Sequence, residues 1–329
     1  MKLLIAGLGS IGRRHLRNLL TLGESDILLY RTNKSTLADD ELAPFPTYTD
    51  LEQALAQNPG AVIVSNPTAA HMGVALLAAE AGCHLFIEKP ISHNLQGLDR
   101  LKRALEKHNR QLLVGFHFRY HPVLEQIKQV IESGEIGRPL SAHVHWGEYL
   151  PAWHPWEDYR SAYAARAELG GGVVLTLCHP FDYLRWLIGE VGNLSARVAK
   201  VSDLEINVED HADVSLQFEN GCMGFVHLDY YQRPAAHWLQ ITTSNGFIYW
   251  DNESGSAKVY NAADKVWRVF NVPSGFERNN LFLSEMAHFL SVVKDGALPG
   301  CGYEDGLQAL KIALAVHTSS ANGSAIIEP

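Results

Sequence analysis

Short apolar segments alternate with amphipathic segments over the first third of the chain. We expect strands at 2–7, 26–31, 61–66, 84–90 and 111–116, and helices from residue 12 to 19 or 20 and at 51–57, 70–82 and 95–109. Apolar strands separated by helices are typical of a parallel sheet that is covered on both faces. Residues 1–120 are therefore predicted to form an α/β domain.

The pattern changes after residue 120, where closely spaced strands replace the alternation. Strands are predicted at 140–146, 194–201, 212–220, 222–231, 237–244, 246–252, 257–262 and 267–272, and closing helices at 281–296 and 305–323. Strands joined by short turns form mostly antiparallel sheets. Residues 121–329 are therefore predicted to be an α+β domain with a large sheet.

The first turn of the chain contains three glycines in the pattern G-x-G-x-x-G. Gly7, Gly9 and Gly12 follow the N-terminal strand and open a helix, which is the setting of a dinucleotide-binding loop. Gly7 permits the tight turn, Gly9 admits a pyrophosphate, and Gly12 allows helix and strand to pack closely. The helix N-terminus, with Ser10 and Ile11, is expected to stabilise the anion. A dinucleotide cofactor with a Rossmann domain follows from this pattern.

Polar residues end two of the predicted parallel strands. Ser65 and Asn66 follow one strand, and Glu88 and Lys89 follow another, before Pro90 stops the ladder. Ligands of open parallel sheets bind beyond the carboxyl ends of the strands, so these residues are predicted to face the cofactor. The alternative is that the charges lie there only because the chain has reached water.

The second strand bears on the choice of cofactor. NAD-preferring domains usually end this strand with an acid that holds the ribose 2′-hydroxyl, whereas here it ends in Arg31, followed by Thr32 and Lys34. Basic and neutral polar side chains suit a 2′-phosphate, so NADP(H) is favoured over NAD(H). The alternative is that Arg31 points to solvent and NAD binds without an acidic clamp.

Residues 168–191 combine an apolar stripe with chemically reactive side chains. At helical spacing, the face opposite the stripe carries Thr176, His179, Asp182, Tyr183 and Trp186. Pro180 leaves two alternatives: a helix kinked at the proline, or a helix that starts near His179 with Pro180 in its first turn. In the second case the angular argument fails for Thr176 and survives for Asp182.

Composition and charge exclude several classes of protein. The net charge of −9 and the absence of a basic run argue against partners such as nucleic acid or an acidic membrane. No run of about 20 apolar residues is present that could span a bilayer. The four cysteines form no CxxC pair, and no Cys/His group has zinc spacing, so we expect reduced thiols, a cytoplasmic protein and no metal.

The chain resembles the Gfo/Idh/MocA family of oxidoreductases over essentially its whole length. The matching segments are "GLGSIGRRH", "SNPTAAH", "EKPIS", "GFHFRYHP" and "GGGVVLTLCHPFDYLRWLIG". The resemblance implies a Rossmann domain, then an open-faced sheet that often forms homo-oligomers (dimers or tetramers), with a sugar, sugar acid or polyol bound between the domains. It also implies NAD(P)-dependent hydride transfer at a carbinol carbon.

The same resemblance assigns roles to individual residues. It places Lys89 at the reacting carbon and cofactor, His71 in the cofactor site, and His179 as the general acid/base. Many members have an aspartate one helical turn before that histidine, where this chain has Thr176. The nearest acid by sequence is Asp182, which is therefore the catalytic candidate for orienting His179.

The substrate side is predicted from aromatic and basic residues. Residues 145–166 are rich in aromatic and polar side chains that suit a sugar ring, and Arg119 and Arg160 suit a carboxylate or phosphate. The predicted substrate residues are Arg119, Tyr159, Arg160, Thr176 and His179. The alternative is that many of these side chains only pack the protein interior.

Two other functions remain open at this point. One is an NAD-dependent glycosidase, which oxidises its substrate transiently and regenerates its cofactor. The other is a non-catalytic, nucleotide-sensing regulator of the same fold, against which Lys89 and His179 argue. A net change in cofactor redox state during turnover distinguishes a dehydrogenase from the glycosidase.

Overall fold

The computed structural model describes residues 1–32, 37 and 40–329, and the chain forms two compact units. The first unit contains Met1–His117, Glu168–Gly170 and Arg278–Leu307; the second contains Phe118–Ala167, Gly171–Glu277 and Gln308–Pro329. The sequence predicted one boundary near residue 120. The structure differs because the segment that begins at Arg278 returns to the first unit.

The first unit contains a parallel six-stranded sheet in the order β3-β2-β1-β4-β5-β6. This order reverses direction between β1 and β4, which is where open α/β sheets bind ligands. The strands are β1 (Leu3–Ala6), β2 (Ile27–Tyr30), β3 (Thr47–Tyr48), β4 (Ala61–Val64), β5 (His84–Glu88) and β6 (Leu112–Gly115). The prediction of a Rossmann-type parallel sheet is confirmed, and only the short β3 was missed.

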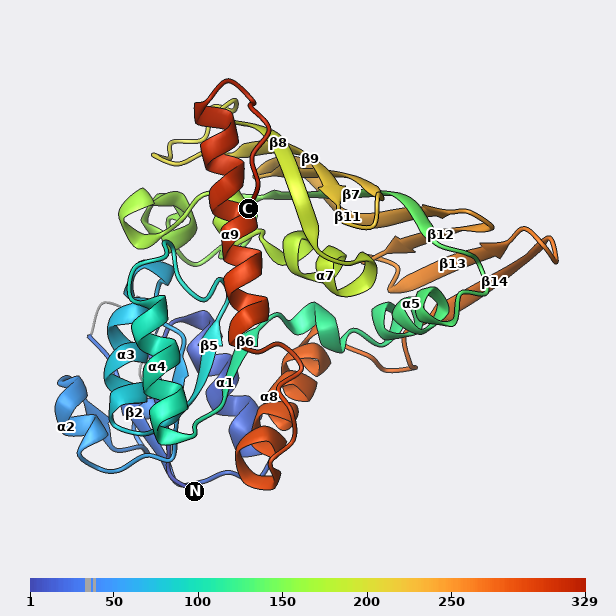
Figure 1. Cartoon of the computed structure of the whole chain (residues 1–329). Helices are drawn as coiled ribbons and strands as arrows, with labels where there is room; N and C mark the ends of the chain where they lie inside the picture. The colour runs from blue at the N-terminus through green and yellow to red at the C-terminus, as the bar shows by residue number, and fades with distance from the viewer. Residues whose placement is uncertain (33–36, 38–39) are drawn as a thin grey trace. The chain divides into compact units, whose positions relative to one another are not determined.

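Helices cover both faces of this sheet. On one side lie α3 (His71–Glu80) and α4 (Leu98–His108), and on the other α1 (Ser10–Thr21) and α8 (Arg278–Asp295) (Figure 1). The short α2 (Leu51–Leu55) precedes β4. Helix α8 packs against α1, and its Met286 and Phe289 join the core formed by Leu3, Ile5 and Phe86. The return of residues 278–307 to this unit therefore buries an apolar helix face that the sheet needs as cover.

The second unit contains an eight-stranded sheet in the order β14-β13-β12-β11-β7-β10-β9-β8. Strands β7 and β10 pair in parallel, and the other described pairings are antiparallel, as predicted. The strands are β7 (Pro139–Tyr149), β8 (Val191–Ala199), β9 (His211–Phe218), β10 (Met223–Asp229), β11 (Tyr231–Thr243), β12 (Gly246–Asp251), β13 (Ser256–Asn261) and β14 (Val266–Asn271).

The two faces of this sheet differ in character. In β7, Ala142, Val144 and Trp146 are buried, whereas the alternate residues His143 and His145 point to the other face and are exposed or half-buried. Helices α5 (Pro122–Ser133) and α6 (Val173–Thr176) contact the sheet. The other two α-helices described after β6, apart from α8, are α7 (His179–Ile188) and α9 (Tyr303–Ala321). We call the side that bears His143 and His145 the outward face.

Helix α7 settles the alternative raised by Pro180. It begins at His179 with the proline in its first turn, and the separate short helix α6 ends at Thr176. The chain therefore restarts a helix at His179 instead of kinking a longer one. In the described part of the chain, no helix combines the length and apolarity needed to cross a bilayer.

Candidate active site

The glycine loop after β1 has the backbone geometry that its sequence predicted. Gly7 has φ +102°, and a Cβ there would overlap the backbone of Asn66. A Cβ on Gly12 would overlap the carbonyl oxygen of Gly7 and lie 2.8 Å from Ser65 Oγ. Both positions therefore exclude a side chain, because the loop, α1 and β4 meet there.

Gly9 differs from the other two glycines because its missing side chain serves no packing purpose. Among the described residues, no atom lies within 4 Å of the place that a Cβ on Gly9 would take. Gly9 is also the N-cap of α1 and provides no side-chain cap, so the first N–H groups of the helix, at exposed Ser10 and half-buried Ile11, lack a partner from the cap residue. This arrangement fits the pyrophosphate of a dinucleotide, which accepts hydrogen bonds from such a helix terminus.

Loops after β4 and β5 are tied together next to this turn. Ser65 Oγ donates to the Gly7 carbonyl at 2.9 Å. The ring nitrogens of His71 lie 2.9 Å from the carbonyl oxygens of Asn66 and Pro90. Burial lowers the pKa of His71, so the neutral ring donates to one of these two carbonyls. Ser65 and His71 thus fix the loops on which Asn66 and Lys89 lie.

The carboxylate of Glu88 is held from within the first unit. Its Oε1 lies 2.6 Å from Nε2 of the fully buried His15, and its Oε2 accepts a hydrogen bond from the backbone N–H of Lys89 at 3.3 Å. These contacts fix the Glu88 carboxylate beside Lys89, and the direct cofactor contact that the sequence predicted for Glu88 stays a prediction. Lys89 itself is half-buried at the carboxyl end of β5.

His15 was not predicted from the sequence. It lies three residues after Gly12 on the buried side of α1, where its ring also contacts Phe86 with centroids 4.9 Å apart. A histidine beside Leu16 and Leu19 on the buried side of the helix was the available signal. Its partner Glu88 is 73 residues away in the chain, so only the fold shows why a polar ring is there.

The segment that follows β2 is described in part. Arg31 is half-buried and donates its backbone N–H to the Tyr48 carbonyl at 3.0 Å, and Thr32 is exposed. Lys34, the third predicted residue, lies outside the described residues. Glu41, further along, pairs with Arg13 and Arg17 of α1. The Glu41 carboxylate is therefore already neutralised by basic residues.

In the second unit, His179 is buried among aromatic rings. It is 2% exposed and packs edge-on against Phe118, with ring centroids 5.1 Å apart, and against Trp146 at 5.6 Å. Trp146 also stacks on His237 at 4.2 Å, and His237 Nε2 lies 3.1 Å from the Tyr183 hydroxyl. Burial lowers the pKa of His237 well below its usual value, so this second histidine is neutral.

Asp182 and Arg119 are partners of each other. Arg119 donates from Nε to Asp182 Oδ2 at 2.9 Å and from its terminal nitrogen to Oδ1 at 2.7 Å, and both side chains are buried. A carboxylate that receives a two-point hydrogen bond from arginine is satisfied by it. The structure therefore gives Asp182 and Arg119 a strong contact with each other, and the roles predicted for them toward His179 and a substrate anion stay predictions.

The other predicted substrate residues lie in different surroundings. Thr176 is buried at the end of α6. Arg160 is exposed and pairs with Asp158 and Glu205, and the Tyr159 hydroxyl accepts the Glu205 N–H at 3.1 Å. A surface pocket is lined by Arg160, Lys200 and Asn207, among others, but not by Thr176 or His179. Thr176 and His179 therefore do not share this pocket with Arg160, and the substrate roles of these residues stay predictions.

The first unit is thus a dinucleotide-binding fold, and comparison with known proteins gives the family. The family profile "Oxidoreductase family, NAD-binding Rossmann fold" matches residues 1–116, and "GFO/IDH/MocA C-terminal domain" matches residues 124–249. The chain belongs to the GFO/IDH/MocA oxidoreductase family, as the motifs predicted.

Individual relatives span nearly the whole chain. It is 29% identical over 337 residues to a myo-inositol 2-dehydrogenase of Thermotoga maritima, covering 97% of this chain and 96% of the relative. A 1,5-anhydro-D-fructose reductase of Ensifer adhaerens is 26% identical, with 80% and 78% covered. A levoglucosan dehydrogenase, solved with NADH and levoglucosan, superposes with a TM-score of 0.86 at 20% identity, covering 100% and 99% of the two chains. The last likeness concerns the fold alone.

Proposed function

We propose that this chain is an NAD(P)-dependent dehydrogenase or reductase that acts on a ring carbinol of a polyol or sugar. The observation that carries the proposal is the carboxyl edge of the first sheet. There the glycine loop leaves open space at Gly9, and Lys89 follows directly on β5 with its backbone held by Glu88. The relative named as a myo-inositol 2-dehydrogenase supports a cyclic polyol as substrate.

Each residue in the proposal has a stated chemical task. A bound nicotinamide supplies the hydride acceptor or donor. As a carbinol is oxidised, its hydroxyl must lose a proton, and in this proposal His179 takes it. The ammonium of Lys89 holds the same oxygen and stabilises its developing negative charge. In the direction of reduction, His179 returns the proton.

The experiment is a turnover assay with myo-inositol, 1,5-anhydro-D-fructose and levoglucosan, with both cofactors and in both directions. We expect Lys89→Ala and His179→Ala each to lower turnover by at least about 100-fold, with cofactor affinity much less changed. Lys102→Ala and His143→Ala are matched controls, because both side chains are exposed. Near-normal turnover in either active-site variant would remove its catalytic role, and turnover without net cofactor reduction would favour the glycosidase.

We also propose that NADP(H) is preferred over NAD(H). Arg31 and Thr32 directly follow β2, and neither of them repels a 2′-phosphate. Arg13 and Arg17 already neutralise Glu41, so that carboxylate is a weak candidate for holding a ribose 2′-hydroxyl. The levoglucosan dehydrogenase structure contains NADH, but its 20% identity carries no cofactor preference over to this chain.

Two further proposals concern the molecule's state in the cell. The outward face of the second sheet exposes Met223 and Phe225, with exposed fractions of 52% and 37%, and such patches favour a homo-oligomer, a dimer or tetramer. A monomer in light scattering at micromolar concentration would contradict this.

The four cysteines are buried free thiols, which suits the reducing cytoplasm. Localisation of a tagged chain outside the cytoplasm would contradict that assignment.

A further inference from the structure

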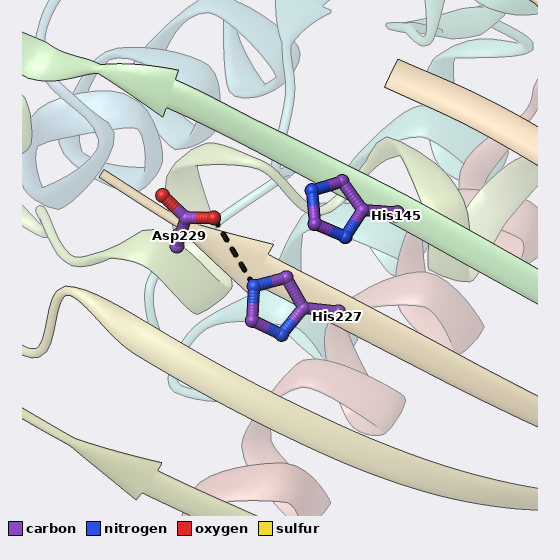
Figure 2. A group of neighbouring side chains, drawn as sticks. All are labelled: His145, His227 and Asp229. Atoms are coloured by element: carbon purple, nitrogen blue, oxygen red, sulfur yellow. Dashed lines mark hydrogen bonds and ion pairs between the residues drawn. The ribbon is translucent and has the colours of Figure 1, made fainter. Parts of the chain in front are cut away.

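Histidines and carboxylates from neighbouring strands meet on the outward face of the second sheet. The parallel pairing of β7 with β10 sets His145 beside His227, and the antiparallel pairing of β10 with β9 sets His227 beside Asp213. The His145 and His227 rings stack with centroids 4.7 Å apart. Figure 2 shows both imidazoles on the same side of the sheet, with Asp229 next to them.

Asp229 is aimed at this point by its backbone contacts. Its Oδ1 accepts hydrogen bonds from the N–H groups of Tyr231 at 2.9 Å and Gln232 at 2.7 Å. Its Oδ2 lies 3.1 Å from His227 Nε2, which is the contact dashed in Figure 2. The Asp229 side chain is 1% exposed. One oxygen therefore fixes the carboxylate while the other faces the histidines.

His227 is oriented in the same way, from its other nitrogen. Its Nδ1 lies 2.7 Å from Asp213 Oδ1, so Nδ1–H donates to that carboxylate and Nε2 faces Asp229. A carboxylate that fixes the far nitrogen of a histidine is the usual support of a metal-binding imidazole.

Gly147 makes room for this arrangement. It lies opposite Asp229 in the β7–β10 register, and a Cβ on Gly147 would overlap Asp229 Oδ2 and Gln232 Oε1. Gln232 Oε1 is also 2.5 Å from His145 Nε2. An amide oxygen thus lies beside the two imidazoles and the carboxylate, in reach as a further oxygen ligand.

We propose that His145, His227 and Asp229 form a binding site for a divalent first-row transition ion such as Zn²⁺ or Co²⁺. One donor atom from each of the three residues lies within 4.8 Å of the others. Two imidazole nitrogens and one carboxylate oxygen suit these ions, whereas Mg²⁺ and Ca²⁺ prefer an all-oxygen set. A bound ion would join β7 to β10 and stabilise the folded second unit.

This site differs from the one that the sequence analysis excluded. The expectation of no metal rested on the spacing of Cys and His in the chain, which detects only ligands on one local segment. Here the ligands come from two strands that the sheet register brings together. The adjoining set His211, Asp213 and His227 has similar proximity, but there Asp213 accepts from both histidines and is therefore the supporting carboxylate.

The experiment is a titration of the chelator-treated full chain with Co²⁺, followed by visible absorption, and with Zn²⁺, followed by calorimetry. We expect one ion per chain and a rise in Tm with Zn²⁺. His145→Ala, His227→Ala and Asp229→Asn should each weaken binding by at least about 10-fold, and Asp213→Asn by about 10-fold or more through the orientation of His227. His143→Ala is the matched control, because His143 is exposed on the same strand and face and should bind as the wild type does.

Each outcome decides for or against the assignment. Absence of binding to the wild type overturns the site, as does binding that His145→Ala leaves unchanged. If His211→Ala weakens binding as strongly as His227→Ala while His145→Ala does not, the ion lies at the other triad and the assignment is wrong. The half-buried His145 is the deciding position if the buried Asp229 variant does not fold. Metal binding is measured without turnover, so this test is independent of the proposed hydride transfer.

Discussion

Removal of one partner of the Arg119–Asp182 pair should destabilise the second unit strongly. The two side chains are 7% and 1% exposed and are joined by hydrogen bonds of 2.7 and 2.9 Å. Arg119→Met leaves a buried carboxylate without its arginine, and Asp182→Leu leaves a buried guanidinium without its acid. The variant that carries both changes replaces the pair with apolar side chains.

The magnitude follows from burial and distance. Opposite charges about 4 Å apart attract by about 4 kcal/mol at an effective dielectric constant of about 20. One-sided removal of buried pairs costs about 3–5 kcal/mol, because the remaining charge stays desolvated, whereas apolar replacement of both partners is often close to neutral. We therefore expect each single variant to lose about 3–5 kcal/mol and the double variant to lose less than either.

The assay is urea unfolding of the four proteins, analysed as a double-mutant cycle. Additive losses, or single losses below about 1 kcal/mol, would refute the reasoning from the buried pair. Kinetics give a second criterion. If Arg119 binds a substrate anion, Arg119→Met raises KM while its unfolding free energy stays near that of the wild type, and the sequence-based role of Arg119 would be restored.

Two further predictions concern the cofactor and pH. Arg31→Asp should shift the ratio of the kcat/KM values for NAD and NADP toward NAD by at least about 10-fold. A wild type that already prefers NAD tenfold, or a ratio that the substitution leaves unchanged, would show that Arg31 does not contact the 2′ position. Burial raises the pKa of the Glu209 carboxyl from 4.5 to about 7, although the hydrogen bond from the Val174 N–H acts in the opposite direction. Between these two pH values the folded state keeps a proton that the unfolded state has lost. The unfolding free energy should therefore fall as the pH rises from 4.5 to 7, by about 3 kcal/mol in total relative to Glu209→Gln. Parallel pH profiles of unfolding free energy for the two proteins would contradict this.

The sequence determined the local features of this protein. The glycine loop, the apolar strands of the first unit and the alternating strands of the second were all predicted, because strand period, turn glycines and helix spacing are encoded in neighbouring residues. The same holds for the start of α7, where Pro180 restricted the choice to two alternatives. The family followed from such local motifs, since each consists of adjacent residues.

The tertiary structure decided which distant residues became partners. The sequence of α8 does not say which unit the helix packs against, and only its contact with α1 assigns it to the first unit. Asp182 is one turn from His179 in sequence, yet its carboxylate binds Arg119, 63 residues earlier. Glu88 likewise binds His15. A buried charge takes the partner that the fold brings within hydrogen-bonding distance, and sequence separation carries no information on that distance.

The cluster on the outward face shows the same limit most clearly. His145 and His227 have ordinary surroundings in the sequence, and alternation in β7 and β10 predicts only that they share a face. Strand order and register place them side by side, because β7 pairs in parallel with β10 although the two are far apart in the chain. A shift of one residue in that register would turn one histidine to the opposite face. The sequence therefore determined which side chains this face carries, and the pairing of the strands decided which of them meet.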